Sequence, residues 1–184
     1  MKKIFMLCLA GALALATTSC KDEKQTITVQ TITVNGLTSE VQSAFYMAED
    51  LAEEGGEAGT GLTLLPTFLQ TLPEDEPDFY VGIEISESLY DKTVDLTKPI
   101  VKSGTLEPYL DIVAASEGQS FEIDNSEGSI DIFVGEADTS LTVTSGTLKV
   151  TKNGDDFSVK LSVTLSDGKF ISADWKGTAI KIVE

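Results

Sequence analysis

The clearest pattern in the chain is a strict alternation of apolar and polar residues in its C-terminal third. Across residues 157–165, Phe, Val, Leu, Val and Leu alternate with Ser, Lys, Ser and Thr. This period of two is typical of a β-strand with one buried face. Asn153-Gly154 and Asp167-Gly168 flank the run, and both dipeptides favour tight hairpin turns. We therefore expect an antiparallel meander of three strands, and one further strand after it, over residues 147–152, 157–165, 169–175 and 179–183.

Shorter alternating runs occupy the middle of the chain. Residues 79–86 alternate between apolar and polar side chains, and the same pattern returns in residues 121–123, 130–132 and 141–143. Glycines separate these runs at roughly the 8–12-residue spacing that is typical of an all-β domain. We therefore predict an all-β, mainly antiparallel fold of about 9–11 strands, arranged as a β-sandwich or a barrel.

One segment favours a helix. Ser39 to Gln42 fits a capping box, and the apolar residues from Val41 to Ala52 follow helical spacing. Gly55-Gly56 would end such a helix. We predict one short helix over residues 39–54, and the alternative is a strand across residues 41–48.

A repeated tetrapeptide breaks the period near the N-terminal end of the β region. Residues 26–29 and 31–34 both read Thr-Ile-Thr-Val, so the apolar positions shift from odd to even numbers at Gln30. A regular strand would turn half of these apolar side chains outward. We therefore predict a β-bulge or a sharp bend at Gln30-Thr31.

The first twenty residues carry the features of an exported protein. Lys2 and Lys3 precede an apolar run over residues 4–16, which is too short to span a bilayer comfortably. The following Ala-Thr-Thr-Ser-Cys, residues 16–20, resembles the lipobox of bacterial lipoproteins, although Thr17 stands where that family more often has Leu. The resemblance implies that residues 1–19 are removed as a signal peptide. It also implies that Cys20 carries the lipid anchor.

The residues after Cys20 extend this resemblance. Residues 21–24 read Lys-Asp-Glu-Lys, which is similar to the export tag on surface lipoproteins of some glycan-scavenging gut Gram-negative bacteria. The resemblance implies attachment to the outer membrane and exposure at the cell surface. Residues 20–24 would then be a lipidated, charged tether. No linker-like stretch follows, so we expect residues 25–184 to form a single β domain.

The run from Ser145 to Thr178 resembles a C-terminal pattern of small lipoproteins in the same bacteria. It reads Ser-Gly-Thr, two alternating strands about a Gly turn, Asp-Gly, and an aromatic strand that closes on Gly177-Thr178. The resemblance implies a β-sandwich or a calycin-like barrel and leaves both architectures open.

Composition excludes much of the usual chemistry. The formal charge is −17, all 13 basic residues are Lys, and the chain has no His. A nucleophile activated by His is therefore impossible, and an acidic chain without Arg is unsuited to nucleic acid. Paired carboxylates remain, but among 30 acidic residues a suitable pair arises by chance. No stretch has the spacing of a Ca²⁺-binding loop. We expect no enzymatic activity, no cofactor and no metal site.

Two aromatic residues are the candidates for ligand binding. Trp175 is the one Trp of the chain, and Tyr80 lies in the alternating run over residues 79–86. We expect Trp175 to pack in the core at a seam of the sandwich; as a sugar-stacking platform it would need an exposed ring. The sequence thus predicts a non-catalytic surface lipoprotein that binds a glycan or an envelope protein. The alternatives are a calycin-like carrier of a small apolar ligand and a pilin-like or adhesive subunit.

Overall fold

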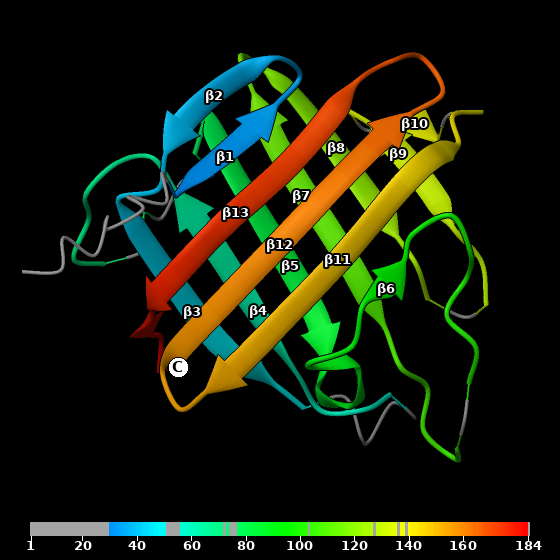
Figure 1. Ribbon diagram of the computed structural model, residues 1–184, viewed down its shortest axis with the longest axis horizontal. Helices are drawn as coiled ribbons and strands as arrows, with labels where there is room; N and C mark the ends of the chain where they lie inside the picture. Colours follow the sequence, from blue (N-terminus) through cyan, green and yellow to red (C-terminus); the bar gives the residue numbers. More distant parts are fainter. Residues whose placement is uncertain are drawn as a thin grey trace, which may run out of the picture.

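The structure is a computed structural model that describes residues 30–50, 56–71, 73, 77–102, 104–126, 128–135, 137–138 and 140–183. The predicted signal peptide, Cys20 and the predicted tether over residues 20–24 lie outside the described residues. The described residues form fourteen strands in two mostly antiparallel sheets that pack face to face (Figure 1). A 3-10 turn, η2 (Glu87–Leu89), follows one of the strands. Eleven strands are longer than two residues, and the architecture is a β-sandwich.

Six strands form the first sheet. In spatial order they are β2 (Leu37–Glu40), β1 (Thr31–Val34), β13 (Phe170–Thr178), β12 (Asp156–Leu165), β11 (Val143–Asn153) and β6 (Val94–Asp95). The predicted meander is confirmed as β11, β12 and β13, each longer than expected. Its turns contain Gly154 and Gly168, both at positive φ, whereas Asn153 and Asp167 keep negative φ.

Eight strands form the second sheet. In spatial order they are β10 (Ala137–Asp138), β9 (Asp131–Val134), β8 (Gln119–Asp124), β7 (Leu110–Ser116), β5 (Phe79–Ser86), β4 (Gly59–Leu65), β3 (Ser43–Glu49) and β14 (Ile180–Lys181). The predicted last strand is therefore β14. It is only two residues long and pairs in parallel with β3, in the sheet opposite to the meander.

The core lies between the two sheets. Every second residue of β12, from Phe157 to Leu165, is at most 4% exposed and faces the other sheet. Strands β5 and β7 cover this face with residues such as Ile83 and Ile112, each 1% exposed or less. Among the described residues, no helix is long and apolar enough to cross a membrane.

The predicted helix over residues 39–54 is wrong. Residues 37–40 form β2 and residues 43–49 form β3, so the alternative of a strand over 41–48 is close to the observed one. The cause is burial on both faces: Ala44 and Tyr46 enter the main core, whereas Phe45 packs in a second cluster on the outer face. A strand buried on both sides has continuous apolar residues, which a helical period also fits.

The barrel alternative is also wrong, because the two sheets do not close into one. The predicted bend at Gln30-Thr31 depends on residues 26–29, which lie outside the described residues. From Thr31 onward β1 is regular, with Ile32 and Val34 buried in the core.

The alternating face of β12 provides a test of the core. Leu161 is 4% exposed, and its substitution by Ala should lower the free energy of unfolding by about 3 kcal/mol, because a cavity remains. The neighbouring Lys160 is exposed to solvent, so Lys160→Ala should change the free energy of unfolding by less than about 0.5 kcal/mol. Urea unfolding followed by far-UV circular dichroism measures both. Equal losses would contradict the assignment of the buried face.

Candidate functional site

Two chain crossings frame an opening on one side of the sandwich. The chain passes from β2 in one sheet to β3 in the other through Val41 and Gln42, and from β13 to β14 through Ala179. Between these two crossings, no described segment of the chain passes from one sheet to the other. We call this opening the lateral groove.

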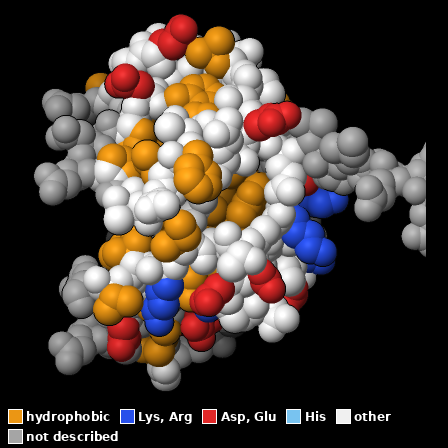
Figure 2. All heavy atoms as spheres, turned by 90° about the vertical axis from the view of Figure 1, so that its left-hand side faces the viewer, with side chains coloured by type: hydrophobic (Ala, Val, Ile, Leu, Met, Phe, Trp, Pro, Cys, Tyr) orange, Lys and Arg blue, Asp and Glu red, His pale blue; other side chains and the backbone are white. Residues whose placement is uncertain are grey.

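The lateral groove has a volume of about 410 Å³. Figure 2 looks onto this side of the molecule, where hydrophobic side chains gather in a hollow and acidic side chains lie around its margin. The residues that line the groove are Gln30, Val41, Gln42, Ser43, Ala44, Phe68, Leu69, Gln70, Trp175, Lys176, Gly177, Thr178 and Ile180.

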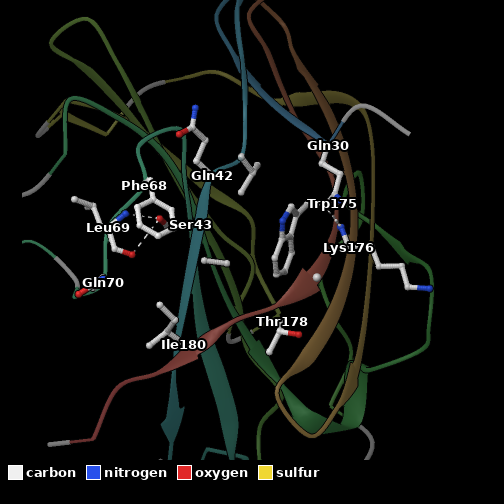
Figure 3. Close-up of a pocket in the computed structure, with 13 residues that line it drawn as sticks. Gln30, Gln42, Ser43, Phe68, Leu69, Gln70, Trp175, Lys176, Thr178 and Ile180 are labelled. Atoms are coloured by element: carbon white, nitrogen blue, oxygen red, sulfur yellow. Dashed lines mark hydrogen bonds between the residues drawn. The ribbon is translucent and has the colours of Figure 1, made fainter. Parts of the chain in front are cut away.

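Trp175 forms an inner wall of the groove. Its ring points from β13 into the space between the sheets (Figure 3) and is 6% exposed, so the residue belongs to the core as well as to the groove. Gly177 makes this position possible, because a Cβ atom there would lie 2.9 Å from Cζ2 of Trp175. The sequence correctly placed Trp175 at a seam. Its role in binding stays a prediction.

Phe68 forms the opposite wall, and the sequence reasoning missed it. Its ring is 69% exposed, the most exposed aromatic side chain among the described residues. Ser43 holds the loop that carries it: Ser43 Oγ donates to the carbonyl of Thr67 at 2.8 Å and accepts from Leu69 N–H at 2.7 Å. Ser43 thus holds the main chain on either side of Phe68, whose exposed side chain lines the groove.

The groove combines apolar walls with polar residues at its rim, and its described lining carries little charge. Gln42 and Gln70 are exposed at its rim, and Gln30 Oε1 accepts from Lys176 N–H at 3.0 Å. Among the described lining residues, Lys176 is the one that carries a charge, and its side chain points away from the groove (Figure 3). None of these described residues is acidic, although the chain as a whole has 30 acidic residues. The groove therefore suits an uncharged ligand with apolar faces and hydroxyl or amide groups.

The second predicted binding residue, Tyr80, lies elsewhere. It packs with Phe45 and Val113 on the outer face of the eight-stranded sheet, where Gly61 and Gly82 leave a hollow of about 180 Å³. Tyr80 is 9% exposed. The structure therefore does not bring Tyr80 and Trp175 together, because Trp175 of the six-stranded sheet packs in the core between the sheets, whereas Tyr80 belongs to the outer cluster.

A row of carboxylates crosses this outer face beside the hollow. Glu84 is opposite Asp111, Asp111 is opposite Asp124, and Asp124 is opposite Asp131 on four neighbouring strands. Like charges directly opposite each other destabilise a sheet. The sequence shows each residue as an ordinary polar position of an alternating strand. Only the register between strands reveals that the four form a row.

Asp111 is the most perturbed member of the row. Burial, together with the negative charges of Glu122, Glu84 and Asp124, raises the pKa of Asp111 to about 7. Its Oδ1 is buried without a hydrogen-bond partner among the described residues. Burial and the charge of Glu49 also raise the pKa of Glu84. In the described part of the chain, no group of three or more acidic residues is arranged to hold a metal ion.

Comparison of the chain with protein-family models, curated proteins and solved structures finds no match. The assignment of a function therefore depends on the geometry of these two faces.

The carboxylate row predicts an unusual dependence of stability on pH. Because the folded pKa of Asp111 is above the unfolded value of about 3.9, the folded state binds the proton more tightly, and stability should fall between about pH 4 and pH 7. Asp111→Asn should remove this loss. At pH 8 the variant should be more stable than the parent by on the order of 2 kcal/mol, and at pH 4 the two should be nearly equal.

Urea unfolding across this pH range measures the effect. Asp174→Asn is the matched control, since Asp174 is exposed on the opposite sheet and its substitution removes the same charge. If both variants show the same dependence on pH, the effect comes from net charge and not from the row.

Proposed function

We propose that the protein is a lipid-anchored surface lipoprotein whose β-sandwich binds a ligand in the lateral groove without catalysing a reaction. The ligand is an uncharged glycan, or a glycan-bearing component of the cell envelope. The anchor is the lipid on Cys20, and the tether over residues 20–24 places the domain at the outer surface of the outer membrane. These parts of the proposal come from the resemblance to lipoproteins described above.

The observation that carries the binding proposal is the lining of the groove. One exposed aromatic side chain, Phe68, lies across the groove from the buried ring of Trp175, and the exposed amides of Gln42 and Gln70 lie at the rim. Sugar rings have apolar faces that pack on aromatic rings, and their hydroxyl groups exchange hydrogen bonds with amides. The lack of acidic residues among the described lining residues is consistent with a neutral ligand.

The same lining argues against glycoside hydrolysis in this groove. Such hydrolysis needs two carboxyl groups on either side of the scissile bond. None of the described residues that line the groove carries a carboxyl group. Carboxyl groups do meet on the outer face of the eight-stranded sheet, but the aromatic residues beside them, Phe45 and Tyr80, are buried and offer no platform to a sugar.

The alternative of a carrier for a small apolar ligand has less support. A calycin-like carrier holds its ligand inside a closed barrel, whereas this fold is a sandwich with side chains filling the space between its sheets. A pilin-like or adhesive subunit is the second candidate, because the pairing of β13 with β1 among the described residues ends at Asp174, beside the groove. Such an edge can accept a strand from a neighbouring molecule.

Glycan binding should depend on the exposed ring in the groove. In a glycan-array screen with the full chain, we expect saturable binding to neutral glycans, and Phe68→Ala should weaken it by roughly tenfold. Phe170→Ala is the matched control, because Phe170 is also partly exposed, at 37%, and lies at the other end of β13. The proposal fails if no glycan binds, or if both variants lose the same affinity.

Lipidation should depend on Cys20. Cells fed a palmitate analogue should incorporate it into the parent protein and not into Cys20→Ala, because the thiol is the acceptor of the lipid in the family that the sequence resembles. Fractionation should then find the variant no longer attached to the outer membrane. Label that persists in Cys20→Ala would refute the anchor.

A further inference from the structure

A second hollow lies next to the lateral groove, on the outer face of the six-stranded sheet. It has a volume of about 420 Å³. Ser158 and Lys176 in its lining alternate with the core residues Phe157 and Trp175, so their side chains face away from the core. We call it the meander hollow, because strands β11, β12 and β13 provide its lining, which consists of Thr151, Asn153, Asp156, Phe157, Ser158, Lys176 and Gly177.

The meander hollow and the lateral groove meet at β13. Lys176 and Gly177 line both of them, so this one strand separates the two. The side chain of Lys176 points away from the groove (Figure 3). Gly177 has no side chain on the groove side, where a Cβ atom would lie 2.9 Å from the ring of Trp175. A ligand that crosses β13 at Gly177 therefore meets main chain and not a side chain.

The register between strands directs two rows of polar side chains across the meander hollow toward the groove. In the first row, Thr151 is opposite Ser158, and Ser158 is opposite Lys176. In the second row, Asp156 is opposite Thr178, whose hydroxyl donates to the Asp156 carboxylate at 2.6 Å. Lys176 and Thr178 both line the lateral groove. Each row therefore ends at a residue that the two surfaces share or that borders on the groove.

The chemistry of these rows suits sugar hydroxyl groups. The hydroxyls of Thr151 and Ser158 both donate and accept hydrogen bonds, the Lys176 ammonium donates, and the Asp156 carboxylate accepts. Among the described residues that line the hollow, these two charges balance. The aromatic ring in the lining, Phe157, is 2% exposed and offers no stacking platform. The meander hollow would thus hold a sugar by hydrogen bonds, whereas the lateral groove provides the aromatic contact.

We propose that the meander hollow is a second subsite for the ligand of the lateral groove, and that this ligand is a neutral oligosaccharide long enough to occupy both. One end of the oligosaccharide packs between Phe68 and Trp175. The following units cross β13 at Gly177 and exchange hydrogen bonds with Ser158 and Asp156 on the outer face. Each hollow alone is near the low end of the range of about 300–1,000 Å³ that is typical of ligand sites. The inference rests on the proposed function and adds the length and the direction of the bound chain.

The subsite predicts that affinity increases with the length of the glycan. The probes are the dimer and the hexamer of glucose, of mannose and of xylose, and the dimer serves as the ligand of the groove alone. The protein is the full chain in mild detergent. Calorimetry gives the affinity, and the emission of Trp175, the single Trp of the chain, reports occupation of the groove. The hexamer should bind roughly threefold to tenfold more tightly than its dimer, because the outer units gain hydrogen bonds.

A matched pair of variants assigns this gain to the meander hollow, since a longer glycan also offers more ways to bind. Ser158→Leu removes a hydroxyl and places a larger side chain in the hollow, so the hexamer should bind no more tightly than the dimer. Ser162→Leu is the control: Ser162 lies on the same strand and the same face but is not among the described residues that line the hollow. It should retain the full gain. The affinity of the dimer should be equal in all three proteins, which shows that the groove is intact.

Four results would overturn the second subsite. The dimer and the hexamer could bind the parent equally, which would confine the ligand to the lateral groove. Both Leu variants could lose the gain, or neither could, and either result would place the added contacts elsewhere. The hexamer could bind without a change in the emission of Trp175, which would place it outside the groove. If these tests fail while the dimer still binds in the groove, the proposed function stands; if no glycan of either length binds, both are refuted.

Discussion

The structure depends on one constraint: each sheet has an apolar face that only the other sheet can cover. The described residues contain no cysteine, so no disulfide among them ties the layers together. The alternating stripe of β12 is covered by β5 and β7, and the crossings from β2 to β3 and from β13 to β14 keep the sheets in place at one side. Because both crossings lie on the same side, the space between them becomes the lateral groove. The groove is thus a consequence of how the sandwich is closed.

Charge is distributed around this core unevenly. Carboxylates that could have been spread over the surface meet in a cross-strand row on the outer face of the eight-stranded sheet, where Asp111 is partly buried and its pKa is raised. The described residues that line the lateral groove include no acidic side chain. A strongly acidic protein therefore presents one nearly neutral, partly aromatic surface. This difference in charge between the groove and the rest of the surface supports the groove as the ligand site more strongly than the volume of the groove does.

The sequence predicts the meander well, because period two and the Gly turns are local signals. It fails where burial on both faces of β3 hides the period. A local signal against the helix was nevertheless present: Asn35-Gly36 is a hairpin dipeptide, and both residues have positive φ in the turn that joins β1 to β2. Phe68 and the carboxylate row could not be predicted, since an exposed ring on a loop and a register between strands depend on tertiary packing.

Trp175 shows why a sequence can identify a residue and still leave its role open. Its alternation with Ala173 predicts an inward direction, and the ring is indeed buried in the core. What the pattern cannot show is that Trp175 also lines the lateral groove, because a groove wall is made by residues from several elements that only the folded chain brings together.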